Sequence, residues 1–237
     1  MNNKSLLSIA TAFTLFAGSV YGDDLNGWTF GGSIYGLAAG MSGKVAVKGV
    51  PADVDVGFDK IWEHLKLGAM GTATVGYDRW SMSTDVIYMD LRASKGSVQV
   101  QARQWMVEPT IGYVVCQYFT AYAGSRFNSI HLAINGPLGV NPASTHDWWD
   151  PIVGGKTSIP LGKGVSLDLN GDVGGFGVSS DVTWQLFPHV SWRFNRYASL
   201  QAGYRFLYTD YQTGSGLSRF KYDMLTTGPQ IGFEVAF

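Results

Sequence analysis

The chain has 237 residues, of which 15% are charged, 14% are aromatic and 31 are glycine. Its formal net charge of −1 gives no electrostatic basis for binding nucleic acid, and its single cysteine excludes an intrachain disulfide. No linker or low-complexity stretch divides the chain, so we expect one folded domain after an export signal.

The amino-terminal residues have the pattern of a secretory signal peptide. Met1–Lys4 is positively charged, and Leu6–Val20 is mostly apolar. Val20-Tyr21-Gly22 then offers small or tolerable residues at the positions that a signal peptidase requires. A membrane-spanning anchor is the alternative, but an anchor needs about 20 apolar residues. We therefore expect residues 1–22 to be a signal peptide and residues 23–237 to form the mature domain.

The rest of the chain contains ten runs of alternating polarity, as strands with two different faces show. They lie near Trp28–Met41, Leu65–Tyr77, Trp80–Leu91, Val98–Val114, Phe119–Leu132, Trp149–Pro160, Val165–Val173, Val182–Phe194, Ala198–Tyr208 and Phe220–Phe237. A tilted strand needs about 9 to 11 residues to cross a bilayer. The sequence therefore predicts an all-β, antiparallel transmembrane β-barrel of ten strands. Eight strands and a soluble lipocalin-like barrel are the alternatives.

Short and long connections alternate along the chain. Transmembrane barrels have short periplasmic turns and longer external loops, so both termini are expected on the periplasmic side. In the first long loop, Phe58–Lys66 has the apolar spacing of a short amphipathic helix. The neighbouring Asp53, Asp55 and Asp59 lack a complete ligand pattern, so we interpret them as solvated loop charges and expect no metal or cofactor.

The strand faces indicate a lipid-facing exterior. In Val165–Val173, apolar residues alternate with Ser166, Asp168, Asn170 and Asp172, which is typical of lipid outside and a polar lumen inside. Trp184 and Trp192 lie on one face of the next strand, and we expect both to be interfacial aromatics. We expect the same role for Trp148 and Trp149 at the outer rim, with contact to a host or glycan ligand as the alternative.

The carboxy-terminal strand, Gln230–Phe237, carries apolar Phe233, Val235 and a terminal Phe237 in alternation. With the segments Trp149–Gly154, Gly171–Val178, Gly203–Tyr208 and Gly228-Pro229, it resembles a group of Gram-negative outer-membrane β-barrel proteins, small barrels largely of unassigned function. The resemblance implies an outer-membrane location. It also implies that Phe233, Val235 and Phe237 form the signal read by the barrel-assembly machinery. It transfers no catalytic residues.

Charged residues on the predicted inward faces are of both signs. They are Glu108, Arg126, Lys156, Asp168, Asp172, Arg193, Arg205 and Glu234. Charges in so narrow a lumen must pair, because an isolated buried ion is very unfavourable. This lumen charge cluster predicts a paired polar plug, and the alternative is a narrow polar path for small solutes.

Three functional classes follow. The first is a structural or surface-exposed outer-membrane barrel, with a narrow polar pore as one form of it. The second is a porin-like channel for small solutes. The third is a lipid-modifying enzyme, which rests on His189 and Ser191 sharing one face, but no further hydrolase motif supports catalysis. We expect no enzyme activity, a monomer, and lipid and lipopolysaccharide as its surroundings.

Overall fold

The computed structural model describes residues 27–57, 67–95, 98–135 and 143–237. Its strands are β1 (Trp28–Leu37), β2 (Gly40–Val47), β3 (Val50–Val56), β4 (Leu67–Tyr77), β5 (Trp80–Lys95), β6 (Val98–Cys116), β7 (Phe119–Asn135), β8 (Ala143–Gly162), β9 (Val165–Gly174), β10 (Val182–Arg193), β11 (Ala198–Thr213) and β12 (Phe220–Ala236). A 3₁₀ turn, Gly216–Ser218, precedes β12. The predicted signal peptide and the predicted helix at Phe58–Lys66 lie outside the described residues. Within those residues, no helix is long and apolar enough to cross a membrane.

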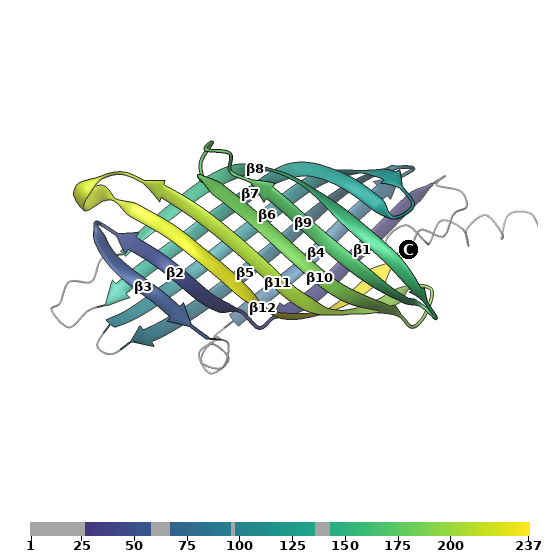
Figure 1. Cartoon of the computed structure of the whole chain (residues 1–237), viewed down its shortest axis with the longest axis horizontal. Coiled ribbons are helices and arrows are strands. Elements are labelled where there is room, and N and C mark those ends of the chain that lie inside the picture. Colours follow the sequence, from purple (N-terminus) through teal and green to yellow (C-terminus); the bar gives the residue numbers. More distant parts are fainter. Residues whose placement is uncertain (1–26, 58–66, 96–97, 136–142) are drawn as a thin grey trace, which may run out of the picture.

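Ten of these strands close into an antiparallel barrel, as predicted (Figure 1). β1 pairs with β4 on one side and with β12 on the other, and each remaining barrel strand pairs with its neighbours in the chain. Phe30 and Phe237 exchange backbone hydrogen bonds of 2.8 and 2.9 Å, so the last residue completes the seam. Closure leaves these ten strands without a free edge over the membrane.

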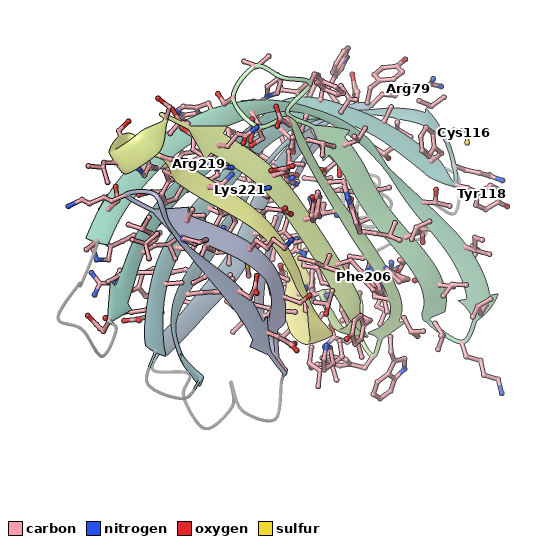
Figure 2. All side chains as sticks on the ribbon, turned by 60° about the vertical axis from the view of Figure 1, so that its left-hand side comes forward. Arg79, Cys116, Tyr118, Phe206, Arg219 and Lys221 are labelled. Atoms are coloured by element: carbon pink, nitrogen blue, oxygen red, sulfur yellow. The ribbon has the colours of Figure 1, made fainter. Side chains whose placement is uncertain are left out.

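The two ends of the barrel differ in their connections. Turns of a few residues, such as Asp78-Arg79 and Gln117-Tyr118, lie at one end of the barrel. The first residue of β1 and the last residue of β12 lie at the same end. Figure 2 shows Arg79, Cys116 and Tyr118 at this end, and Arg219 and Lys221 at the other. Because short turns face the periplasm in transmembrane barrels, the opposite end faces the outside.

The hairpin of β2 and β3 was not predicted, since the sequence from Gly43 onward reads as a long loop. The structure corrects this interpretation. β2 continues from β1 after a break at Ala38-Ala39 and pairs with Lys221–Thr227 of β12, while β3 pairs with β2. A Cβ atom at Gly228 would lie 2.0 Å from the Ala38 carbonyl oxygen, so only glycine fits beside this break. The exposed Asp53 and Asp55 lie on β3.

Two belts of aromatic side chains surround the barrel. The outer girdle contains Tyr88, Trp105, Phe127, Trp149, Trp184 and Tyr208. The inner girdle contains Trp28, Trp80, Tyr113, Trp192, Phe194 and Phe233. Along β5, β6 and β10 the two girdles are eight residues apart. At about 3.3 Å per residue and a tilt of about 40°, this is roughly 20 Å, to which the rings add their own length, in keeping with the ~25 Å apolar band of such barrels.

The inside-outside polarity of the strands reverses at the outer girdle. Between the girdles, Leu167 and Leu169 are 46% and 44% exposed on the outer surface, whereas Asp168 between them faces inward and is 6% exposed. Beyond the outer girdle, Phe220 and Tyr222 face inward and are buried, while Lys221 faces outward. The first pattern fits lipid outside, and the second fits water outside. The same strands therefore build a membrane barrel and a water-exposed extension of it.

We call this extension the head; it comprises residues 40–57, 89–95, 98–104, 128–135, 143–148 and 209–224. Buried apolar side chains fill its interior, and they continue inward to the level of the outer girdle. They are Met41, Val45, Val47, Ile87, Met89, Met106, Ile130, Leu132, Trp148, Leu207, Phe220, Tyr222 and Met224. We call them the head core. Three come from β2, so the unpredicted hairpin supplies part of the packing that closes the outer end.

The reversal predicts opposite effects for one substitution at two sites. Leu169→Arg places a charge near the middle of the lipid band, where it should cost about 2–4 kcal/mol. Ser129→Arg faces outward in the head, where water solvates the charge, and should change stability by less than about 0.5 kcal/mol. Urea unfolding of both variants in lipid bilayers measures the difference. Equal losses would contradict the assignment of the two regions.

The head also predicts a dependence of stability on pH. The His146 ring stacks on Phe220 with a centroid distance of 3.9 Å. Burial lowers the pKa of His146 below its usual value, although Asp147 acts in the opposite direction. The folded state then binds fewer protons than the unfolded state, so the contribution to stability is complete above the unfolded pKa of about 6.5 and is lost as the pH falls. Between pH 7.5 and pH 5, His146→Gln should lose less stability than the unmodified protein. An equal loss in both proteins would argue against a role for His146.

Candidate functional site in the barrel lumen

The lumen between the girdles contains a layer of charged and polar side chains directly below the head core. We define this central polar layer as Asp85, Glu108, Arg126, Asp172, Gln185 and Arg205. Its members come from β5, β6, β7, β9, β10 and β11, and the inward alternation of each strand places them at one level. Three carboxylates therefore share this layer with two guanidinium groups.

Arg126 is the centre of one half of this layer, and its side chain is fully buried. Its Nε donates to Glu108 Oε1 at 2.8 Å, and one terminal nitrogen donates to Asp172 Oδ1 at 2.8 Å. The other terminal nitrogen donates to Thr183 Oγ1 at 2.7 Å. Gln185 donates to both carboxylates. These charge-assisted bonds offset part of the desolvation of three buried ions.

Arg205 organises the other half. Its terminal nitrogens donate to Asp85 Oδ2 at 3.1 Å, to Gln185 Oε1 at 3.1 Å and to the Tyr35 hydroxyl at 3.0 Å. Tyr35 in turn donates to Asp85 Oδ1 at 2.6 Å. Gln185 bonds to members of both halves and so makes them one network. With Tyr35 on β1, side chains of seven barrel strands are joined across the lumen.

A polar cavity lies on the periplasmic side of this layer. Its volume is about 250 Å³, and Asp85, Glu108 and Arg205 form part of its wall toward the central polar layer. Asp78 and Cys116-Gln117-Tyr118 also line it, so the cavity extends to the turns at the periplasmic end. Along the barrel axis, from the external end to the periplasmic end, the lumen thus contains an apolar core, an ionic layer and a cavity open toward the periplasm.

The structure places seven of the eight predicted lumen charges in two sets. Glu108, Arg126, Asp172 and Arg205 belong to the central polar layer, while Lys156, Asp168 and Glu234 line the cavity. Arg193, the last residue of β10, is half-buried and does not line the cavity. The sequence interpretation missed Asp85, Gln185 and Tyr35. Asp85 is two residues from Ile87 and so shares its inward face, which could have identified Asp85 as a lumen residue. The irregular alternation of polarity in this region obscured that signal.

The predicted interfacial aromatics are not all on the outer surface. Trp149 and Trp192 are about half exposed there, and Trp184 lies in the outer girdle. For Trp148 the prediction is wrong, because its side chain faces inward and is 4% exposed. Its ring stacks on Tyr211 at 4.0 Å. The predicted external loop had ended at Trp148, whereas β8 already begins at Ala143.

Trp148 also bonds to a buried polar group that ties β8 to the loop after β9. Its Nε1 donates to Asp150 Oδ2 at 2.9 Å and to Ser180 Oγ at 3.0 Å. Ser180 donates to Asp150 through its backbone nitrogen at 2.8 Å and its hydroxyl at 2.6 Å. Gly175 donates to the Pro151 carbonyl at 3.1 Å and has a φ of +85°, which glycine adopts without strain. The Trp-Asp-Pro and Gly-Asp-Val-Gly-Gly segments therefore contact each other.

The side chains considered for catalysis are not arranged as a nucleophile and base. His189 Nδ1 lies 3.1 Å from the Phe187 carbonyl oxygen, and Nε2 lies 3.7 Å from Asp168 Oδ2. Ser191 is on the same face and is buried. Because both ring nitrogens of His189 are directed at other groups, the imidazole is not positioned to accept the Ser191 proton.

The predicted assembly residues lie on the outer face of the closing strand. Phe233 is 39% exposed and the terminal Phe237 is 58% exposed. Val235 pairs with Gly32 of β1 and with Ala198 of β11. This placement leaves Phe233 and Phe237 accessible from outside the barrel, and their role in assembly stays a prediction.

Comparisons with known proteins bear on the fold. No family model and no curated protein matches the chain. Similar solved structures include the outer membrane protease OmpT from Escherichia coli, which is 7% identical with a TM-score of 0.52, over 89% of this chain and 97% of that chain. The translocator domain of the autotransporter NalP from Neisseria meningitidis is 14% identical with a TM-score of 0.44, over 93% and 91% of the two chains. The attachment invasion locus protein Ail of Yersinia pestis is 9% identical with a TM-score of 0.41, over 90% and 99%.

At this level of identity the likeness to OmpT shows the fold and transfers no activity. The closed even-stranded barrel, the apolar band and the two girdles carry the same conclusion independently. The chain is therefore an integral β-barrel protein with the fold of the Gram-negative outer-membrane barrels.

Proposed function

We propose that the protein is a non-conducting, surface-exposed barrel of the outer membrane. The observation that carries this proposal is the closed lumen, in which the buried guanidinium of Arg126 joins Glu108 to Asp172. A hydrated ion path needs a continuous polar channel, whereas here a desolvated ionic layer lies against an apolar core. The head, with its own packed interior, is the part that can meet other molecules outside the cell.

The proposal is tested by planar-bilayer recording of residues 23–237 refolded in detergent. Circular dichroism and resistance to protease first establish that the barrel is folded. We expect no unitary current steps above those of an empty-detergent control, while gramicidin added to the same membrane conducts. Reproducible steps would overturn the proposal and favour the solute channel, with Lys156 and Asp168 on the cavity wall as selectivity residues.

An enzymatic role is not part of this proposal. One structural neighbour is a protease, but 7% identity gives no reason to transfer its activity. The arrangement of His189 and Ser191 described above supports a structural role for both. Loss of lipid deacylation in Ser191→Ala, measured on purified protein against the unmodified chain, would instead favour the lipid-modifying enzyme.

The partners of such a barrel follow from its surfaces. We propose that lipid and lipopolysaccharide contact the band between the girdles, and that the assembly machinery reads Phe233, Val235 and Phe237. Replacement of Phe237 by Ser should lower the amount of barrel inserted in cells while leaving refolding in detergent unchanged. Equal insertion of both proteins in cells would argue against the signal.

A further inference from the structure

The periplasmic cavity has an uneven distribution of charge. Among its lining residues, Asp85 is paired with Arg205, and Glu108 is paired with Arg126. Apart from Asp78 at the mouth, three charged groups of the wall remain outside these pairs, namely the carboxylates of Asp168 and Glu234 and the ammonium of Lys156. With His189 neutral, this part of the wall has one negative charge in excess.

The two carboxylates are held by neutral donors. Asp168 accepts hydrogen bonds from Ser158 and Ser166. Glu234 accepts from Gln201 at 2.6 Å and from Ser199 at 3.2 Å. These donors fix the carboxylates on the wall without neutralising them. In the described part of the chain, Lys156 makes no hydrogen bond or ion pair, and its ammonium lies 5.8 Å from the centre of the Tyr122 ring.

Two buried polar atoms on the same wall have no protein partner among the described residues. They are Gln230 Oε1, an acceptor, and Arg205 Nε, a donor. Both side chains are only 4% exposed, and both line the cavity. A buried polar atom left without a hydrogen bond is unfavourable, so this part of the wall favours an occupant with polar groups of its own.

The size and the lining of the cavity limit the range of possible ligands further. At about 30 Å³ for each water in the liquid, a volume of 250 Å³ equals that of about eight waters, which is the size range of a small organic solute. Phe187 and Tyr35 contribute flat apolar surface, and Asp78 adds a further carboxylate near the mouth. A metal ion is disfavoured, because no three His, Cys, Asp or Glu side chains of the described residues converge as ligands.

We propose that this cavity is a periplasm-facing binding site for a small primary amine with a flat or apolar body. The ammonium group is received by the carboxylates of Asp168 and Glu234, and the ligand's own polar group lies beside the Gln230 and Arg205 side chains on the same wall. One positive charge on the ligand balances the excess negative charge of the wall. Binding from the periplasm requires no path through the central polar layer.

The test is calorimetric titration of the folded barrel in detergent with tyramine, and with tyrosol, in which a hydroxyl replaces the ammonium. Protein-free micelles give the background of each compound. We expect tyramine to bind with a dissociation constant below about 1 mM and tyrosol to bind at least about tenfold more weakly, the difference being one charge-assisted contact. Equal affinities, or no binding of tyramine at 10 mM, which is about ten times that limit, would overturn the proposal.

Variants assign the contacts. Glu234→Gln and Asp168→Asn should each weaken tyramine binding about tenfold or more and leave tyrosol unchanged. Lys156→Met should strengthen tyramine binding, because it removes a like charge from the wall. The direction of this change in affinity still tests the site if a carboxylate variant fails to fold. Asp147→Asn, which changes an exposed carboxylate of the head, is the matched control, and weakening there as strong as at Glu234 would contradict the site.

Discussion

Arg126→Met should destabilise the barrel by about 3–5 kcal/mol, because it leaves Glu108 and Asp172 buried without their shared cation. Met has a similar length and fills the space, so the loss reports the charge and its hydrogen bonds rather than a cavity. Urea unfolding in micelles, followed by tryptophan fluorescence, measures the shift of the midpoint.

Two further proteins separate this effect from a general intolerance of substitution. Arg103→Met removes a side chain that is 49% exposed and 3.9 Å from Asp90, and should change stability by less than about 0.5 kcal/mol. The triple change Arg126→Met, Glu108→Gln and Asp172→Asn removes all three charges and should recover much of the stability. An Arg126→Met protein as stable as the unmodified one would show that the central polar layer does not hold the barrel closed.

Trp148→Ala should cost about 3–5 kcal/mol, the range for removing a buried aromatic ring. The ring packs on Tyr211 in the head core, and its nitrogen bonds to the buried Asp150 and Ser180. The loss therefore combines a cavity with a buried carboxylate that has lost a donor. The same urea titration measures it.

The neighbouring residue is a matched control. Trp149 is 51% exposed on the outer surface, so Trp149→Ala loses contacts at the membrane interface but opens no internal cavity and unpairs no buried carboxylate, and it should cost clearly less than Trp148→Ala. Both substitutions replace Trp by Ala, and they differ only in the face of β8 that they affect. Similar losses in both variants would contradict the orientation of this strand and the existence of a packed head core.

The membrane part of the fold could be predicted because one rule applies to all of it. Apolar residues on one face and polar residues on the other, as in Val165–Val173, identify both the strand and its lipid side. The aromatic ends of β10 and the terminal Phe237 indicate the same environment. Ten strands, their antiparallel order and the short periplasmic turns follow from repeated use of this pattern.

The head could not be predicted because the same alternation has the opposite meaning there. An alternating strand has two faces, and only the surrounding solvent decides which one faces inward. Trp148 and Trp149 were both assigned to the outer rim from their place at the end of a predicted loop, although Trp148 shares the inward face of Asp150 in β8. The β2–β3 hairpin has few strong signals, since Gly43, Gly49 and Pro51 are typical of loops.

The central polar layer was predictable as a set of inward charges but not as a network. Arg205 and Asp85 are 120 residues apart in sequence, and they meet only because the barrel closes with a particular shear. Alternation places each residue on the lumen face and gives no distance across the lumen. The division of the charges between the layer and the cavity could not be predicted for the same reason.

The reversal of polarity at the outer girdle is tested most directly by site-directed spin labelling along the outward face of β7. Single labels at Ala121, Ala123, Ser125, Ser129, His131 and Ala133, each in a Cys116→Ser background, are compared in lipid bilayers. The accessibility of each label to oxygen and to a water-soluble nickel complex reports whether it lies in lipid or in water. We expect a lipid signature up to Ser125 and a water signature from Ser129 onward, with the change at Phe127. A lipid signature that continues through Ala133 would contradict the existence of a head outside the membrane.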